Sequence, residues 1–182
     1  MTTVHYTRRR LKRLDTPLRL DDLGTDEFTG YASVFDVPDG AGDVVARGAF
    51  AASLRKRPAD RVRLLYQHFA HEPIGVWQEI REDRHGLFVR GRLLTEVARG
   101  REVMALIREG AISGLSIGFR TIQSLRDPIT RHRILKTIEL WEISIVTFPL
   151  SVESQVVAVG TNTLADHIRN ASRSVASGLA LS

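Results

Sequence analysis

The chain has 182 residues, 43% of them hydrophobic and 26% charged, with a formal net charge of +5. This composition is typical of one soluble globular domain, and the lack of cysteine excludes disulfides, thiolate metal sites and a cysteine nucleophile. No apolar stretch is as long as a membrane span and the first residues lack a secretory signal, so we expect a soluble, cytoplasmic protein that contacts no membrane.

The chain begins with a basic segment. Residues 1–22 predict a disordered arm that carries five closely spaced cations, Arg8, Arg9, Arg10, Lys12 and Arg13. Such an arm can bind nucleic acid or another acidic surface, and a solvated terminus without a partner has the same composition. We expect the folded domain to span 23–160, followed by a polar tail over 161–182 with a short helix near 162–171.

The first elements of the domain are a strand and a short helix. Aromatic and β-branched residues favour a strand over 27–35, and the Pro, Gly and Asp content of 36–43 favours a loop. Phe50 and Leu54 lie four residues apart, which indicates a short helix that ends before Pro58.

Strands dominate the middle of the chain. Alternation over 61–68 predicts a strand that ends at His68 and carries this residue on the same side as its apolar residues. A hairpin is expected over 73–94, because "DRHG" supplies a turn between two apolar runs.

A helix and three more strands complete the domain. Helical spacing runs from Thr95, the expected N-cap, to Gly110, which stops the helix. Strands are expected over 110–119, 134–148 and 154–159. The chain therefore predicts a mainly β (α+β) fold: an antiparallel, partly closed β-barrel of about seven strands with two or three peripheral helices.

The run "GAISGLSIGF" sets a serine between two glycines. On a strand, Gly114, Ser116 and Gly118 share one face, and the large apolar residues take the other. Glycine weakens a strand, and one reason to keep it is that a ligand or another backbone comes close. The pattern fits a hydroxyl that an extended peptide approaches, and it also fits a bulge or a barrel bend without chemistry.

Serine needs a base to act as a nucleophile. His68 and His71 directly follow an apolar strand, where an imidazole can face a cleft, and His68 is the better candidate because the strand sets its direction. A partly buried histidine with satisfied hydrogen bonds is the alternative reading of His68. The other four histidines are expected at the surface: His5, His85, His132 and His167.

A catalytic imidazole also needs an acceptor on its second nitrogen. Glu142 stands in the strongly apolar run "IELWEISIVTF", where a carboxylate without a partner would cost several kcal/mol. We expect its partner to be a histidine or one of the many arginines. Glu139 is expected nearer the surface, and Asp43 in the glycine-rich loop is a weaker rival.

Other chemistries have less support in the sequence. His68, His71 and Glu72 could begin a metal site, but the sequence holds no matching second ligand cluster. We expect no metal and no cofactor, and we find no phosphate-binding loop. Nucleic-acid binding by a small barrel is disfavoured because the aromatic residues do not alternate with basic ones on one face.

Six segments occur in a fixed order: "GYASVF", "GDVVARGAFAASL", "LLYQHFAHEPIG", "GLFVRGRL", "GAISGLSIGF" and "LWEISIVTFP". Together, over about residues 28–158, they resemble the prohead protease family of tailed bacteriophages, the serine peptidases that mature a capsid. The resemblance implies a barrel surrounded by helices, similar to the herpesvirus maturation proteases. It also implies that His68 is the base, Ser116 the nucleophile and Glu142 the third member, with His132 as the alternative third residue because the herpesvirus relatives use a second histidine.

The same resemblance implies what the protein acts on. It points to a serine endopeptidase that cleaves the scaffolding segment of the major capsid protein, and often itself, inside an assembling shell. Gly114 and Gly118 would leave room for the substrate backbone. The basic arm would suit an acidic scaffold or packaged DNA, and the oligomeric state stays open, a homo-oligomer included.

A binding protein is the alternative to an enzyme. In this hypothesis the barrel is a non-catalytic assembly factor that binds capsid or scaffold proteins, with nucleic acid held by its basic arm. One distance separates the two hypotheses. A serine peptidase brings the side chains of Ser116 and His68 within hydrogen-bond reach, whereas a binding barrel has no reason to do so.

Overall fold

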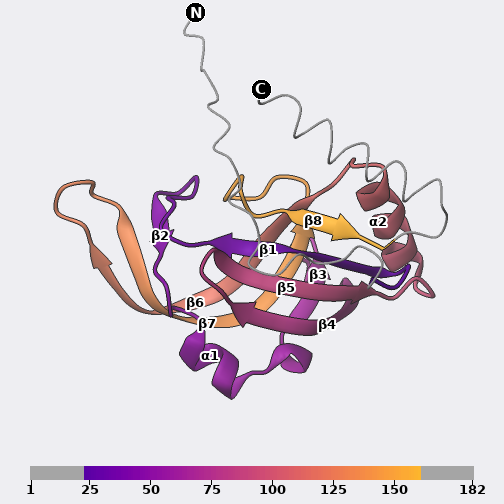
Figure 1. The fold of residues 1–182 in the computed structure, drawn as a ribbon, viewed down its shortest axis with the longest axis horizontal. Coiled ribbons are helices and arrows are strands. Elements are labelled where there is room, and N and C mark those ends of the chain that lie inside the picture. Colours follow the sequence, from indigo (N-terminus) through magenta and orange to yellow (C-terminus); the bar gives the residue numbers. More distant parts are fainter. Residues whose placement is uncertain (1–22, 161–182) are drawn as a thin grey trace, which may run out of the picture.

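The computed structural model describes residues 23–160, so the predicted arm and tail, with His5 and His167, lie outside the described residues. Eight strands of this part form one sheet (Figure 1). They are β1 (Glu27–Val34), β2 (Asp43–Val45), β3 (Arg63–Tyr66), β4 (Pro73–Glu82), β5 (Gly86–Leu93), β6 (Gly114–Arg126), β7 (Arg133–Val146) and β8 (Val156–Val159). Outside the sheet lie the helices α1 (Ala51–Lys56) and α2 (Ala98–Arg108) and the 3-10 turn η2 (Ala59–Arg61). No helix within these residues has the length and hydropathy needed to cross a bilayer.

The sheet is mixed, which corrects the prediction of an antiparallel barrel. Its strands follow the order β2-β7-β3-β4-β5-β1-β8, and β6 lies on the other edge of β7. β7 runs parallel to β2 and β3, whereas the other strand pairs are antiparallel. The connection from β2 to β3 contains α1 and η2. A helical crossover of this kind lets β2 and β3 run in the same direction, and both pair with one edge of β7, β2 near its start and β3 near its end.

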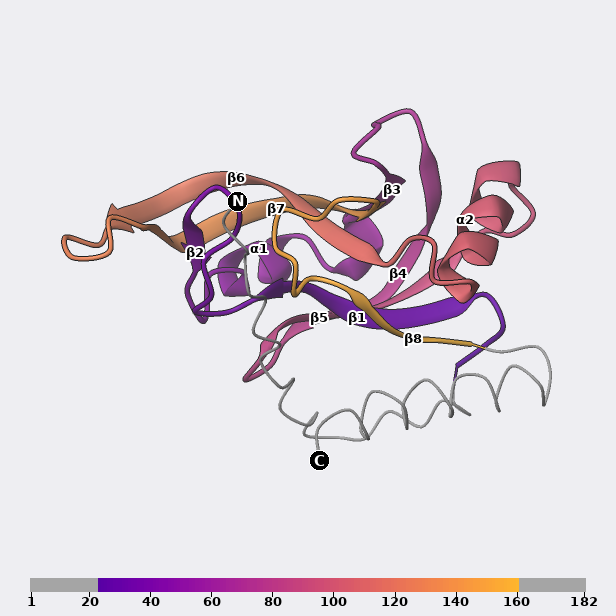
Figure 2. The same cartoon turned by 90° about the horizontal axis from the view of Figure 1, so that it is seen from above.

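The barrel is open, where a partly closed barrel was predicted. Figure 2 shows β6 and β7 curled over β1 and β5 as a half-barrel. At the start of β6, the Leu115 N–H donates to the Ser154 carbonyl at 2.8 Å, which joins this edge to the segment before β8. From Ser116 onward, the outer edge of β6 pairs with no other strand of the described part. A free strand edge therefore borders Ser116.

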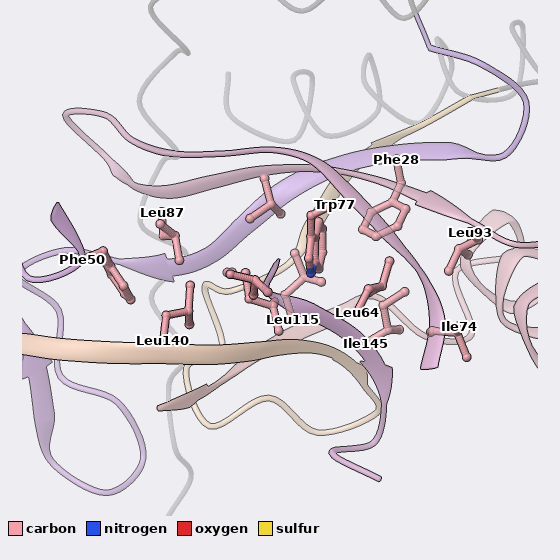
Figure 3. Close-up of a cluster of buried hydrophobic side chains, with 14 of the residues drawn as sticks. Phe28, Phe50, Leu64, Ile74, Trp77, Leu87, Leu93, Leu115, Leu140 and Ile145 are labelled. Atoms are coloured by element: carbon pink, nitrogen blue, oxygen red, sulfur yellow. The ribbon is translucent and has the colours of Figure 1, made fainter. Parts of the chain in front are cut away.

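The core lies between the two curled halves of the sheet (Figure 3). Phe28, Leu64, Trp77 and Leu115 are almost completely buried, and the rings of Phe28 and Trp77 meet edge to face with centroids 5.6 Å apart. Burying a large apolar side chain of this kind contributes about 1.5–3 kcal/mol. Ile143 of β7 belongs to the same core, so the residues on either side of it face away from the core.

Several predicted boundaries differ from the observed ones. Helix α2 begins at Ala98 rather than after Thr95, and no side chain caps it. Gly110 ends it as predicted, with a left-handed φ of +72°. Strand β2 was not predicted, since its three residues are ordered by pairing with the distant start of β7. Strand β6 continues to Arg126, beyond the predicted end at Phe119, because β7 pairs with it along its whole length.

Candidate active site

The candidate nucleophile lies on the outer face of the β6–β7 ladder. Leu115 points into the core and is fully buried, whereas Ser116 points outward and is half-buried. Ser116 pairs in register with Ser144 of β7, and Gly118 pairs with Glu142. Because residues two apart share a strand face, these four positions form a square on the outer face of the sheet.

His68 is carried by a tight turn and not by the strand predicted to extend to it. β3 ends at Tyr66, and Gln67 and His68 both adopt left-handed backbone, with φ of +52° and +63°. The Gln67 N–H donates to the Ile145 carbonyl of β7 at 3.0 Å, and the Phe69 N–H donates to the Tyr66 carbonyl at 3.0 Å. Left-handed backbone is unfavourable for residues with a Cβ, so the surrounding contacts must impose it. The turn holds the imidazole against the outer face of β7. A strand that continued to His68 would instead have directed the side chain toward the core.

Three side chains from separate segments meet at this face. His68 Nε2 lies 3.0 Å from Ser116 Oγ, and His68 Nδ1 lies 2.7 Å from Glu142 Oε1. An ionised carboxylate only accepts hydrogen bonds, so Nδ1 carries the proton and donates to Glu142, and Nε2 is free to accept the Ser116 hydroxyl proton. The structure thus brings together the three residues predicted as catalytic.

The second oxygen of Glu142 also has a partner. Ser144 Oγ donates to Glu142 Oε2 at 2.7 Å, and the same Oγ accepts the His68 main-chain N–H at 3.1 Å. Ser144 is fully buried. The sequence analysis missed this residue. The sequence does contain a feature that could have identified Ser144. Its hydroxyl lies two positions after Glu142, and therefore on the same strand face, within an otherwise apolar run.

The hydrogen-bonded series is partly shielded from water. The Glu142 side chain is 13% exposed, and that of His68 is 44% exposed. The hydrogen bond to Glu142, together with its negative charge, holds the pKa of His68 above its ordinary value of 6.5, while partial burial of the ring acts in the opposite direction. A raised pKa makes this imidazole a stronger base than a free histidine.

Gly118 leaves room for the carboxylate. A Cβ at this position would lie 2.0 Å from Glu142 Oε1 and 2.8 Å from its Cγ. At Gly114, a Cβ would lie 2.6 Å from the Val146 carbonyl oxygen and 2.7 Å from Pro149 Cδ. A side chain at Gly114 would therefore clash with main chain and a proline ring, and one at Gly118 would displace the carboxylate of Glu142. The predicted role of the two glycines in admitting a substrate backbone stays a prediction.

The rival residues lie elsewhere and have other partners. His132 ends the turn at the far end of the β6–β7 ladder, ten residues before Glu142, which is roughly 33 Å along an extended strand at about 3.3 Å per residue. Asp43 binds Arg133, with 2.8 Å between Oδ1 and Nε. Glu139 forms ion pairs with two arginines. Arginines thus neutralise the two rival acids, and the carboxylate in contact with His68 is that of Glu142.

The small metal-ligand group considered from the sequence does not converge. Glu72 accepts a hydrogen bond from Arg99 Nε at 3.0 Å, and His71 is exposed. Among residues 23–160, no three potential ligands come together as a metal site would require. His85, expected at the surface, is half-buried, with its ring edge to face against Tyr31 at 4.5 Å between centroids.

A hollow borders Ser116 along the free edge of β6. It has a volume of about 60 Å³, and its mostly apolar walls include Val34, Ile117 and Leu150. The Leu115 N–H points away from β7, toward Ser154. Strand alternation directs the N–H and carbonyl of Ile117 the same way, so an unpaired stretch of main chain faces outward beside the candidate nucleophile.

Comparison with known proteins identifies a protease family. The family model for the caudovirus prohead serine protease matches residues 14–168. The prohead protease of Enterobacteria phage HK97 is 34% identical over an alignment of 145 residues that covers 76% of this chain and 64% of that protein. The chain therefore spans less than two thirds of the length of this relative.

The fold resembles that of a phage protease of known structure. The capsid assembly protease of bacteriophage T4 aligns with a TM-score of 0.54 at 13% identity, over 66% of this chain and 80% of that one. The varicella-zoster virus protease aligns more loosely, with a TM-score of 0.47 at 14% identity over 80% of this chain and 74% of that one. Because the family model covers well over half of the chain, including the His68, Ser116 and Glu142 segments, the chain belongs to the caudovirus prohead serine protease family.

Proposed function

We propose that this protein is a serine endopeptidase of capsid maturation. Its substrate is the scaffolding segment of the major capsid protein, cleaved inside an assembling phage-type shell in the host cytoplasm, and its own chain is a second substrate. The observation that carries the proposal is the hydrogen-bonded series from Ser116 through His68 to Glu142, at 3.0 and 2.7 Å. A purely binding barrel has no need of this series.

The first half of the reaction forms an acyl-enzyme. Ser116 Oγ attacks the carbonyl carbon of the scissile bond while its proton passes to His68 Nε2. The imidazolium formed in this step is stabilised by the carboxylate of Glu142, which continues to accept the Nδ1–H hydrogen bond and does not itself become protonated. His68 then gives the Nε2 proton to the leaving amine as the C–N bond breaks, and the acyl group remains as an ester on Ser116.

The second half returns the enzyme to its starting state. A water molecule gives a proton to His68 Nε2 as its oxygen attacks the ester carbonyl. The bond to Ser116 Oγ breaks, the Nε2 proton passes back to Oγ, and the product carboxylic acid leaves. Every proton in the cycle moves through His68, whose raised pKa favours taking it from a weakly acidic hydroxyl.

The free edge of β6 suits an extended peptide. A substrate strand that pairs with the outward N–H and carbonyl of Ile117 would run directly past Ser116. Alternate side chains of such a strand would face the adjoining hollow, whose apolar walls favour small aliphatic groups. The 44% exposure of the His68 side chain leaves the site accessible from solvent.

Ser116→Ala tests the proposal. The protein is co-produced with the major capsid protein of its own particle, and the products are followed on gels and by mass spectrometry of the new termini. Wild type and Ser124→Ala, which alters an exposed serine of the same strand, are expected to cut the capsid protein. Ser116→Ala should lose at least about ten-thousandfold in rate. Cleavage retained by Ser116→Ala would contradict the proposal.

A further inference from the structure

Ser144 makes two hydrogen bonds that the hydrolytic steps do not use. Its Oγ donates to Glu142 Oε2 at 2.7 Å and accepts the main-chain N–H of His68 at 3.1 Å. We propose that Ser144 is a positioning residue of the active site, which holds the Glu142 carboxylate and the His68 turn in a fixed relation. This inference rests on the proposed function, because it assigns Ser144 a role in the same active site.

The carboxylate of Glu142 needs two contacts to be fixed. Rotation about its last side-chain bond is soft, so a single hydrogen bond leaves the plane of the carboxylate free to turn. In this site each oxygen has its own donor, His68 Nδ1–H for Oε1 and Ser144 Oγ–H for Oε2. With Ser144 in place, the carboxylate points one oxygen at the imidazole.

The imidazole needs support because no strand carries it. His68 lies past the end of β3 in left-handed backbone, and its side chain is 44% exposed. The hydrogen bond from its N–H to Ser144 ties this turn directly to β7, the strand that also carries Glu142. Small displacements of a catalytic group cost rate steeply, so fixing the turn to β7 preserves the 3.0 Å contact between His68 and Ser116.

Ser144 is not itself a second nucleophile. It lies opposite Ser116 in the β6–β7 register, yet its side chain is completely buried and both of its hydrogen bonds run to Glu142 and His68. A peptide carbonyl therefore has no path to its hydroxyl. Ser144 therefore acts only through Glu142 and His68, by holding them in position.

The chain offers a matched control in Ser53. This serine is also buried, at 5% exposure, and its Oγ accepts the main-chain N–H of Leu140 of β7 at 2.9 Å, away from the active site. Ser144→Ala and Ser53→Ala therefore both remove a buried hydroxyl that is hydrogen-bonded to the main chain, and only the first removes contacts to Glu142 and His68. Ser144→Cys, which keeps a weaker donor and acceptor of similar shape, provides a graded intermediate.

The first measurement is kinetic. A fluorogenic peptide spanning the mapped cleavage site of the capsid protein gives kcat and KM separately. We expect Ser144→Ala to lower kcat about ten- to hundredfold with KM nearly unchanged, as is typical when a hydrogen bond to a charged catalytic group is lost. Ser144→Cys should fall between Ser144→Ala and wild type, and Ser53→Ala should match wild type. Thermal unfolding of each variant verifies that it is folded.

The second measurement does not depend on turnover. In a Ser116→Ala background, nitrogen-detected NMR follows the titration of His68 with and without Ser144→Ala. A carboxylate that is no longer held on Nδ1 should let the titration midpoint of His68 fall toward 6.5, whereas Ser53→Ala should leave it unchanged. Loss of the downfield Nδ1–H signal would accompany the change.

The two measurements separate this inference from the proposed function. Wild-type protein that neither cleaves the capsid protein nor is labelled on Ser116 by a fluorophosphonate would overturn the proposed function, while the NMR titration would still test the hold of Ser144 on His68. A kcat of Ser144→Ala within about twofold of wild type, together with an unchanged His68 midpoint, would overturn the positioning role.

Discussion

The two ends of β7 lie in one continuous ladder with β6, yet their chemistry differs completely. Near the C-terminal end of β7, Glu142 faces the turn that follows β3, and His68 in that turn donates a hydrogen bond to its carboxylate. At its N-terminal end, β2 occupies the same edge of β7 in the same parallel sense, and Asp43 is bound to Arg133. The difference arises at the edge of β7 that does not pair with β6. The segment that pairs with this edge, β2 at one end and β3 with its turn at the other, determines which partner a polar side chain of β7 finds.

The glycine at the first end strengthens this difference. Gly118 lies opposite Glu142, and because it has no side chain it does not displace the Glu142 carboxylate. At the other end, Arg126 and Arg133 lie opposite each other, a like-charged cross-strand pair that Asp43 partly offsets. One end is shaped around a carboxylate and an imidazole, whereas the other is a solvated turn that projects from the body of the protein (Figure 1).

Exchanging a histidine for alanine at each end should give the largest contrast. His68→Ala removes the group through which every proton moves, so the rate of capsid-protein cleavage should fall at least about ten-thousandfold. His132→Ala at the projecting turn should keep the wild-type rate. Quantitative gels of timed digests measure both. Equal losses in the two variants would mean that the two ends act together and that the comparison fails.

Isosteric replacement of an acid at each end should give the next largest contrast. Glu142→Gln keeps the shape of the side chain but removes the charge that stabilises the imidazolium, and kcat should fall about a hundred- to ten-thousandfold. Asp43→Asn should leave kcat unchanged and lower the free energy of unfolding by about 1 kcal/mol or less, as expected for a partly exposed ion pair. Peptide kinetics and urea unfolding test the pair, and full activity of Glu142→Gln would remove Glu142 from the mechanism.

Adding one methyl group to the ladder sharpens the comparison further. The Cβ of Gly118→Ala would meet Glu142 Oε1 at 2.0 Å, so the carboxylate must move away from His68. We expect kcat to fall about tenfold to a thousandfold, while Ser124→Ala at the solvated end has no effect. A crystal structure of Gly118→Ala should show the displaced carboxylate. Unchanged kcat with Glu142 still on His68 would mean that the strand can yield at this point.

The pH dependence should give the smallest effect. The base must be neutral to accept the Ser116 proton, so activity rises as pH passes upward through the pKa of His68. Because Glu142 raises that pKa, the acid limb of kcat/KM for wild type should have its midpoint above 6.5. In Glu142→Gln the midpoint should move to lower pH, while Asp43→Asn should leave it in place. An acid limb centred below 6.5 in wild type would show that Glu142 does not act on His68 in solution.

Most of the local structure could be predicted from the sequence. Periodicity and turn residues located β1, the β4–β5 hairpin and the two helices, and they located β6 and β7 as strands. These elements are set by neighbouring residues, through alternation, Gly and Pro signals and β-branched composition. Strand β2 was missed for the opposite reason, because its three residues become a strand only by pairing with Arg133 and the residues that follow it.

The direction of strands and the closure of the sheet depended on distant contacts. An antiparallel barrel was the natural expectation for strands adjacent in sequence, but β2 and β3 both lie parallel to β7, and β6 keeps a free edge. Neither fact has a local signature, because a strand's own residues do not specify which neighbour its main-chain groups will bind.

The sequence by itself determined which side chains were available: a serine between two glycines, a histidine after an apolar strand and a glutamate within an apolar one. Only the tertiary structure decided that Glu142 binds His68 while arginines bind Asp43 and Glu139, because these pairings follow from the register of β6, β3 and β2 on β7. It alone also supplied the left-handed turn at His68 and the role of Ser144 beneath it. The physical reason is that hydrogen bonds act over a few ångströms between residues separated by dozens of positions, so the register of the sheet selects the partners.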